Sequence, residues 1–249
     1  MSDVKINPEG KVALVSGGNR GIGKAIVIEL LERGASKVYA GARNPDTLSV
    51  LKDKYGDRLI PLKLDVTDSQ SIAEVVKVAG DVEILINNAG VLKFDSLIAE
   101  DAAENFAYHL SVNVNGLIGL TNAFIAQLKA KPNTAIVNVS SLAGLANMPS
   151  IGTYSVTKAA VHSITQGYRA ELVNDDVLVT GVYPGPIDTD MAKDLQMDKD
   201  SPENVAKAIV DGLESGSEDV FPDAMSSQVG VAYATNPKAI EKEFATYVG

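Results

Sequence analysis

The sequence has 249 residues, of which 45% are hydrophobic and 22% are charged, a composition typical of a soluble globular protein with a substantial core. The net charge of −10 argues against a nucleic-acid or membrane-surface partner, and the absence of cysteine together with only two histidines argues against disulfides, thiolate chemistry and a metal site. No run approaches the ~18 apolar residues of a membrane-spanning helix, and the first residues lack a signal-peptide core, so we expect a cytoplasmic protein.

Short segments rich in Val, Ile and Leu alternate along the chain with longer segments of helical spacing. The expected strands are residues 11–16, 36–41, 58–65, 82–87, 134–140 and 177–183, with a short seventh near 218–223. The expected helices are residues 22–33, about 45–55, 68–79, one long helix within 100–130, 153–173, 202–214 and 237–247. This alternation predicts an α/β fold in a single domain over residues 1–249: a Rossmann-type doubly wound parallel sheet of about seven strands with helices on both faces.

The segment of residues 191–202 is polar but contains three apolar side chains, Met191, Leu195 and Met197. It is interpreted as a candidate substrate lid or as an ordinary surface connection. The sequence does not favour one interpretation over the other.

The glycine-rich stretch VSGGNRGIGKA, residues 15–25, lies between the first expected strand and the first expected helix. Counted from Gly18, it resembles the phosphate-binding loop of nucleotide hydrolases, but Ala25 stands where a Ser or Thr should hold Mg²⁺. Counted from Gly17, it resembles a dinucleotide-binding turn, which would receive a pyrophosphate at a helix N-terminus. The turn alone does not decide between the two.

The end of the second expected strand bears on the choice of cofactor. Sites that prefer NAD place an acidic residue ~20 residues beyond the glycines, where it binds the ribose 2′-hydroxyl. Twenty residues beyond Gly23 this chain has Arg43, and Arg20 is a second cation inside the turn. A guanidinium can bind a 2′-phosphate with two hydrogen bonds. Either arginine alone could be a solvated surface residue, but the two together favour NADP(H).

Six further motifs follow the glycine turn: LDVTD (64–68), NNAG (87–90), VNVNG (112–116), NVSS (138–141), YSVTK (154–158) and YPGPIDTDM (183–191). In order and spacing they match the motif series of the short-chain dehydrogenase/reductase family. Over roughly residues 10–191 the chain therefore resembles the single-domain, NADP(H)-dependent branch of that family, which includes carbonyl reductases. The resemblance implies a nicotinamide-dependent oxidoreductase.

The resemblance also implies a catalytic set of Asn113, Ser141, Tyr154 and Lys158. Tyr154 would protonate the carbonyl oxygen, Ser141 would hydrogen-bond it, Lys158 would bind the nicotinamide ribose, and Asn113 would hold a water that links Lys158 to solvent. Tyr154 and Lys158 are four residues apart and share one helix face. We expect the lysine ammonium to lower the pKa of the tyrosine towards the working pH.

The expected cofactor contacts lie at the C-terminal ends of the strands, where open α/β sheets bind ligands. They are Gly17, Asn19, Arg20, Gly21, Ile22, Gly23, Arg43, Asp65, Val66, Asn88, Ala89, Gly90, Tyr154, Lys158, Pro184, Gly185, Ile187 and Thr189. By resemblance, Asp65 and Val66 would contact the adenine, and the segment from Pro184 to Thr189 would hold the nicotinamide carboxamide.

The expected reaction is the reversible, NADPH-dependent reduction of a ketone or aldehyde, with hydride from the nicotinamide and the proton from Tyr154. The expected substrate pocket is apolar and consists of Leu92, Leu142, Met148, Tyr183 and Met191, which suits an uncharged apolar or aromatic carbonyl compound. Two alternatives stay open: a 3-oxoacyl reductase, and a non-catalytic NADP(H)-binding regulator of the same fold. The resemblance to this family implies a homo-oligomer, either a dimer or a tetramer. The C-terminal segment, however, lacks the Thr-Gly and Asp-Gly-Gly pattern that builds the tetramer of acyl-carrier-protein reductases.

Overall fold

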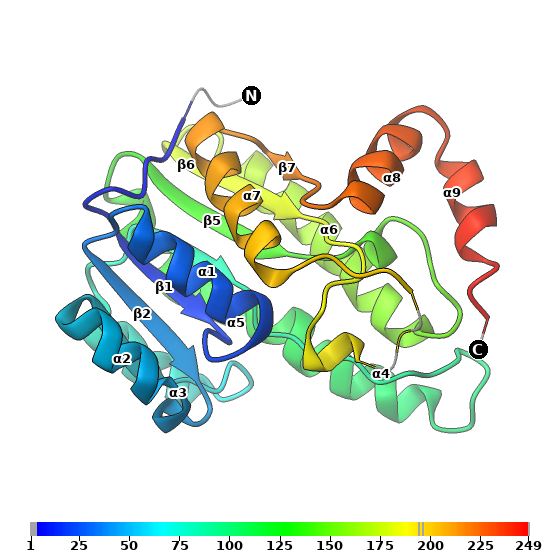
Figure 1. The fold of residues 1–249 in the computed structure, drawn as a ribbon, viewed down its shortest axis with the longest axis horizontal. Coiled ribbons are helices and arrows are strands. Elements are labelled where there is room, and N and C mark those ends of the chain that lie inside the picture. The colour runs from blue at the N-terminus through cyan, green and yellow to red at the C-terminus, as the bar shows by residue number, and fades with distance from the viewer. Residues whose placement is uncertain (1–3, 194, 196, 249) are drawn as a thin grey trace.

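The fold is built on one seven-stranded parallel sheet with strand order β3-β2-β1-β4-β5-β6-β7 (Figure 1). The computed structural model describes residues 4–193, 195 and 197–248. The strands are β1 (Val12–Ser16), β2 (Lys37–Ala42), β3 (Leu59–Lys63), β4 (Ile84–Asn87), β5 (Thr134–Val139), β6 (Val177–Val182) and β7 (Asp219–Val220). After β3 the chain crosses to the other side of β1 and forms β4. The switch point of the sheet, where such sheets bind ligands, therefore lies between β1 and β4.

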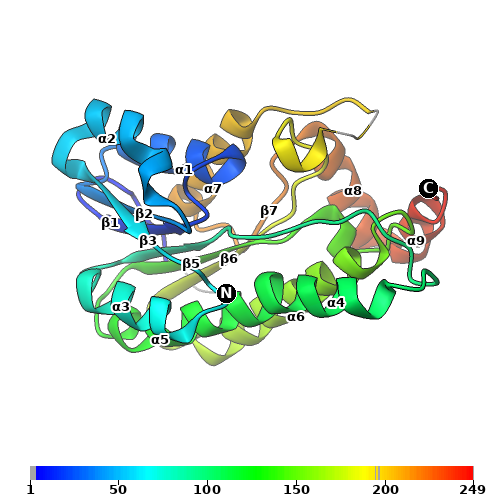
Figure 2. The ribbon, with the colours of Figure 1, turned by 90° about the horizontal axis from the view of Figure 1, so that it is seen from below.

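Helices cover both faces of the sheet, as Figure 2 shows, and the expected doubly wound α/β fold is confirmed. The α-helices are α1 (Gly21–Glu32), α2 (Ser49–Tyr55), α3 (Ser69–Val78), α4 (Ala102–Leu110), α5 (Gly116–Lys129), α6 (Gly152–Glu171), α7 (Pro202–Ser215), α8 (Ala224–Thr235) and α9 (Pro237–Phe244). The helices α1, α2 and α7 lie on one face, and α3, α5 and α6 lie on the other (Figure 2).

The side-chain alternation of β1 shows how the two faces are filled. Ala13 and Val15 belong to the apolar cluster beneath α1 and α7, whereas Leu14 between them belongs to the cluster beneath α3 and α5. Successive side chains of a strand point to opposite faces, so a strand covered by helices on both sides must be apolar at every position. This explains the near-continuous apolar runs in the sequence.

The long helix expected within residues 100–130 is interrupted by one π-helical segment, Ser111–Asn115, which joins α4 to α5. A π-helical turn shifts the following side chains around the helix axis, and such turns are frequent at functional sites. The segment contains Asn113, whose side chain is 2% exposed.

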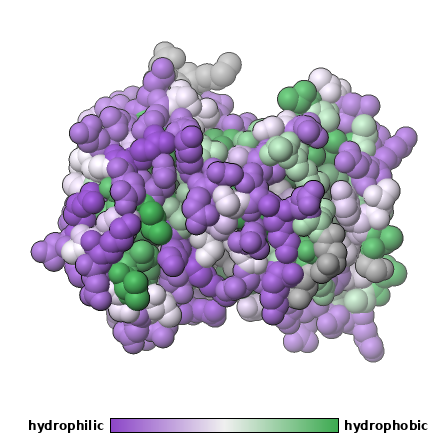
Figure 3. All heavy atoms as spheres, in the orientation of Figure 1, coloured by the Kyte–Doolittle hydropathy of each residue, from purple (hydrophilic) through white to green (hydrophobic). Residues whose placement is uncertain are grey.

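The C-terminal part differs most from expectation. The helix α8 is absent from the predicted elements, and its sequence AMSSQVGVAYAT mixes small, polar and apolar residues without a clear apolar face. It begins at a capping box in which Asp223 and Ser226 hydrogen-bond each other's backbone amides. With α9 it packs on a separate apolar cluster that includes Leu142 and Phe244. Figure 3 shows a mostly hydrophilic face with more hydrophobic side chains over these two helices. Among the described residues, no helix has the length and apolar character needed to cross a membrane.

Candidate active site

The glycine turn between β1 and α1 forms one end of a cleft at the C-terminal edge of the sheet. Gly17 has a φ of +66°, a left-handed conformation that strongly favours glycine. A Cβ atom on Gly23 would lie 2.1 Å from the Gly17 carbonyl oxygen and 2.4 Å from Asn88 Nδ2, so no side chain fits there. The turn therefore brings the backbone and the N-terminus of α1 directly to the cleft, as binding of a pyrophosphate requires.

Hydrogen bonds tie the ends of β1 and β4 together at the switch point. Asn88 Nδ2 donates to the Ser16 and Gly17 carbonyl oxygens at 2.9 and 3.2 Å. Ser16 Oγ accepts from the backbone N–H groups of Asn88 and Ala89 at 3.0 and 3.1 Å. The side chains of Asn88 and Ser16 thus hold the floor of the cleft in place.

Two arginines lie at the same end of the cleft. Arg43 follows β2. Two hydrogen bonds from Thr67, and to a smaller extent the positive charge of Arg43, keep the pKa of Asp65 below its ordinary value. Arg20 precedes α1, and its guanidinium pairs with the Asp190 carboxylate at 3.3 Å. Both side chains of this pair are solvent-exposed, so the ion pair is weak.

Tyr154 and Lys158 project from the first turns of α6 and are 8% and 5% exposed. Lys158 Nζ lies 5.5 Å from the centroid of the Tyr154 ring and donates a hydrogen bond to the Val139 carbonyl oxygen at 2.8 Å. Burial raises the pKa of Tyr154 to about 12, although a hydrogen bond with Ser141 opposes the rise. Burial also lowers the pKa of Lys158 to about 8.

The expectation that Lys158 brings the pKa of Tyr154 down is therefore wrong for this structure. Burial desolvates the phenolate and raises its pKa, while Lys158 directs a proton at the Val139 carbonyl group. The buried phenol is held in its protonated form.

Ser141 follows β5 by two residues and caps the start of the short 3₁₀ turn Leu142–Gly144. Its Oγ accepts from the Ala143 N–H at 3.2 Å and donates to the Pro184 carbonyl oxygen at 3.5 Å. A Cβ atom on Gly144 would lie 2.6 Å from the Lys158 carbonyl oxygen, so only glycine lets this turn pack so closely on α6. The close packing brings Ser141 to Tyr154.

Asn113 lies behind the cleft and is not among the residues that line it. Its Oδ1 accepts from the Val91 N–H at 2.8 Å, and its Nδ2 donates to the Val91 carbonyl oxygen at 3.0 Å and to Thr157 Oγ1 at 3.1 Å. The side chain therefore fastens the loop after β4 to α6.

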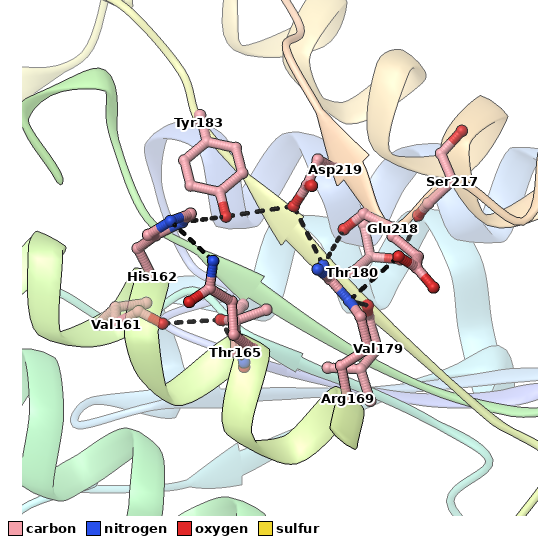
Figure 4. A network of polar contacts seen from close by, with 12 residues as sticks. Val161, His162, Thr165, Arg169, Val179, Thr180, Tyr183, Ser217, Glu218 and Asp219 are labelled. Atoms are coloured by element: carbon pink, nitrogen blue, oxygen red, sulfur yellow. Dashed lines mark hydrogen bonds and ion pairs between the residues drawn. The ribbon is translucent and has the colours of Figure 1, made fainter. Parts of the chain in front are cut away.

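Tyr183 does not belong to the substrate pocket, and this expectation is corrected. Its ring is buried and stacks on Phe221 with ring centroids 5.2 Å apart. Figure 4 shows its hydroxyl group between His162 and Asp219, with an oxygen–nitrogen distance of 2.7 Å to His162 Nδ1 and a hydrogen bond of 3.3 Å to Asp219 Oδ1. A buried phenol must satisfy its hydroxyl group, and these partners draw the side chain into the interior.

The cleft has a volume of about 550 Å³, within the range of small-molecule sites. It is lined by the other predicted residues: Gly17, Asn19, Arg20, Gly21, Ile22, Gly23, Arg43, Asp65, Val66, Asn88, Ala89, Gly90, Leu92, Ser141, Leu142, Met148, Tyr154, Lys158, Pro184, Gly185, Ile187, Thr189 and Met191. Leu195 and Met197, from the segment predicted as a candidate lid, line the same cleft. Sequence reasoning missed Tyr108, Met225 and Tyr247, which also line it. The Asp-x-x-Ser cap before α8 was an available signal for the position of Met225.

Residues 11–200 match the family model for short chain dehydrogenases. A crystal structure of a short chain dehydrogenase from Burkholderia cenocepacia in complex with NADP superimposes with a TM-score of 0.90 at 34% identity, covering 96% of this chain and 99% of that one.

Two curated relatives point the same way. The 3-oxoacyl-[acyl-carrier-protein] reductase FabG of Vibrio cholerae is 37% identical over 194 residues, covering 76% of this chain and 79% of the relative. An uncharacterized oxidoreductase of Staphylococcus aureus is 32% identical over 210 residues, covering 82% and 90%. This chain belongs to the short-chain dehydrogenase/reductase family and is an oxidoreductase of the kind that binds a nicotinamide cofactor.

Proposed function

We propose that this oxidoreductase uses NADP(H) to reduce a ketone or an aldehyde to an alcohol, in a reversible reaction. One observation carries the proposal. Ser141, Tyr154 and Lys158 line the same cleft as the glycine turn and the arginines Arg20 and Arg43. Groups suited to proton transfer thus lie within one continuous site with groups suited to binding phosphates.

The residues at the glycine end fit a phosphorylated dinucleotide. Gly17 and Gly23 leave room for a pyrophosphate against the backbone at the N-terminus of α1. Arg43 and Arg20 would hold the 2′-phosphate by charge-assisted hydrogen bonds. The NADP complex of the Burkholderia relative supports this choice. When bound, the nicotinamide supplies the hydride for the carbonyl carbon.

The chain itself supplies the proton and the stabilisation of charge. With its pKa raised to about 12 by burial, the Tyr154 phenol is protonated at neutral pH and donates its proton to the carbonyl oxygen. Ser141 Oγ–H is hydrogen-bonded to that oxygen as negative charge develops on it. Lys158, whose pKa is lowered to about 8 by burial, still carries a positive charge at neutral pH and favours loss of the Tyr154 proton.

The other end of the cleft suits an uncharged apolar or aromatic substrate. Its walls include Leu92, Leu142, Met148, Met191 and Tyr247. Among the described residues that line the cleft, the lysines and arginines are Arg20, Arg43 and Lys158, all assigned to cofactor or catalysis, so no further cation remains for a substrate carboxylate. Residues 191–202 are proposed as the lid over this end; Asp194 and Gln196 within it lie outside the described residues.

A 3-oxoacyl thioester is a second candidate substrate, because the Vibrio cholerae relative is named as a 3-oxoacyl-[acyl-carrier-protein] reductase. Acetoacetyl thioesters and simple aryl ketones, assayed side by side, distinguish the two. The proposed ranking places the aryl ketones first.

The proposal is tested by following NADPH oxidation with a panel of ketones and aldehydes, using wild-type protein and Tyr154→Phe. Turnover by the wild type and a loss of about 10²- to 10⁴-fold in kcat for the variant are expected. Binding of NADPH without turnover of any carbonyl compound would instead favour a non-catalytic regulator. We also propose that the protein is a single domain that assembles as a dimer or a tetramer in the cytoplasm. Light scattering tests the assembly.

A further inference from the structure

A buried hydrogen-bonded chain lies behind Tyr154, on residues that the proposed mechanism does not use. His109, in the last turn of α4, is 0% exposed, and its Nδ1 lies 2.7 Å from Thr153 Oγ1. Thr153 Oγ1 in turn donates a short hydrogen bond to Asp95 Oδ2. The three residues come from the loop after β4, from α4 and from α6, so the chain connects three separate segments.

The partners of His109 assign its protonation state. Because the Thr153 hydroxyl proton is directed at Asp95, the Thr153 oxygen must accept the Nδ1–H of the imidazole. The Lys93 backbone N–H donates to His109 Nε2 at 2.9 Å, so Nε2 must be an unprotonated acceptor. The pattern is satisfied by the neutral imidazole with its proton on Nδ1.

The charged and titratable groups around the imidazole agree with the neutral form. Burial lowers the pKa of His109, the Asp95 carboxylate opposes this, and the charge of Lys93 adds to it. From α6 the ring faces Tyr154, and on its own helix it lies next to Tyr108, whose ring centroid is 6.1 Å away. Protonated His109 would turn an N–H towards the Lys93 N–H, leaving two donors face to face.

The hydrogen-bonded chain of Asp95, Thr153 and His109 fixes the first turn of α6, which carries Tyr154. Asp95 accepts from the first two amides of that helix: its carbonyl oxygen from Gly152 at 3.2 Å and its Oδ1 from Thr153 at 3.1 Å. The His109 ring meets the Tyr154 ring edge to face, at 77° and 6.0 Å between centroids. His109 thus contacts the phenol directly and also holds the residue that precedes it.

We propose that neutral His109 is a positioning residue for Tyr154, holding the phenol in its proton-donating orientation through Thr153 and Asp95. The inference rests on the proposed role of Tyr154 as proton donor. Protonation of His109 breaks the bond to Lys93, loosens the start of α6 and slows proton transfer without disturbing the distant glycine turn. The consequence is a decline of kcat in acid with unchanged cofactor binding.

Three variants test this proposal. His109→Phe keeps the ring but removes both hydrogen bonds, and we expect kcat to fall about 10- to 100-fold because a misplaced donor is a poor one. The NADPH dissociation constant should stay within about twofold. His109→Gln keeps an acceptor for the Lys93 N–H and does not titrate, so it should retain most activity and lose the acid decline. His162→Gln replaces the only other histidine and should keep the acid decline.

Wild-type kcat in the Phe variant, or an acid decline that persists in His109→Gln, would overturn the proposal; should the Phe variant not fold, the Gln comparison decides. A readout independent of activity is the ¹⁵N spectrum of the imidazoles, assigned with His162→Gln. It should show His109 as the neutral Nδ1–H form at pH 7. The Nε2–H form would overturn the proposed hydrogen-bonded chain from Asp95 through Thr153 to His109, whatever the activity. The Nδ1–H form in a protein that reduces no carbonyl compound would support the hydrogen-bonded chain and overturn the proposed function instead.

Discussion

The proposed preference for NADPH is assigned to Arg43, and Arg43→Asp is expected to reduce the affinity for NADPH while sparing NADH. A hydrogen bond to a charged group contributes about 1.5–3 kcal/mol, and Arg43 is exposed, so solvent screening reduces the figure to about 1–2 kcal/mol. This corresponds to a roughly 5- to 30-fold rise in the NADPH dissociation constant. The introduced carboxylate would stand beside Asp65, whose pKa already responds to Arg43, and would add repulsion of the 2′-phosphate.

The assay is a fluorescence titration of both cofactors with wild-type protein, Arg43→Asp and Lys24→Asp. Lys24 is the matched control, because it is an exposed cation of the same glycine turn that is absent from the cleft lining, and its replacement changes the net charge equally. The control should change the ratio of NADPH to NADH affinity by less than about twofold. An unchanged ratio in Arg43→Asp, or an equal change in both variants, would refute the assignment.

Three further predictions concern the turn, the pH dependence and the pocket wall. Gly23→Ala should abolish measurable cofactor binding, because its Cβ would lie 2.1 Å from the Gly17 carbonyl oxygen, and tight binding by this variant would contradict the geometry. The control Gly167→Ala, with open space around its Cβ, should bind the cofactor normally and have a free energy of unfolding about 0.5–1 kcal/mol higher. Reduction should slow as the pH rises past about 8, because Lys158 then loses its proton, and a profile that is flat up to pH 10 would show that this charge is not needed. Tyr247→Ala should raise KM for aryl ketones about 5- to 30-fold through lost apolar contact, with the NADPH dissociation constant unchanged as the control.

Most of the fold follows from local patterns. Both faces of β1 are buried, so Ala13, Leu14 and Val15 are all apolar, and this regularity reveals a parallel sheet before any contact is known. The carboxyl ends of parallel strands share one edge, so the motifs at those ends could be placed in one cleft from their order alone. The helix α8 was missed because its residues carry no clear helical periodicity, and its start depends on the Asp223 cap.

The site was less predictable where tertiary burial decides. Whether Tyr183 turns towards the cleft or the interior depends on His162 and Asp219, which are distant in sequence. The pKa of Tyr154 depends on how much solvent the folded chain removes, which motif spacing does not reveal. The hydrogen-bonded chain from Asp95 through Thr153 to His109 has no local signature, because Thr153 is 44 positions from His109 and 58 from Asp95.

The most direct test of the account follows a labelled hydride. Wild-type protein is incubated with NADPH carrying deuterium at the transferring C4 position and with an aryl ketone, and the alcohol is analysed by mass spectrometry. We predict one deuterium on the carbinol carbon, formed at a rate that falls about 10²- to 10⁴-fold in Tyr154→Phe while NADPH still binds. An alcohol without deuterium, or a Tyr154→Phe variant as fast as the wild type, would contradict the account.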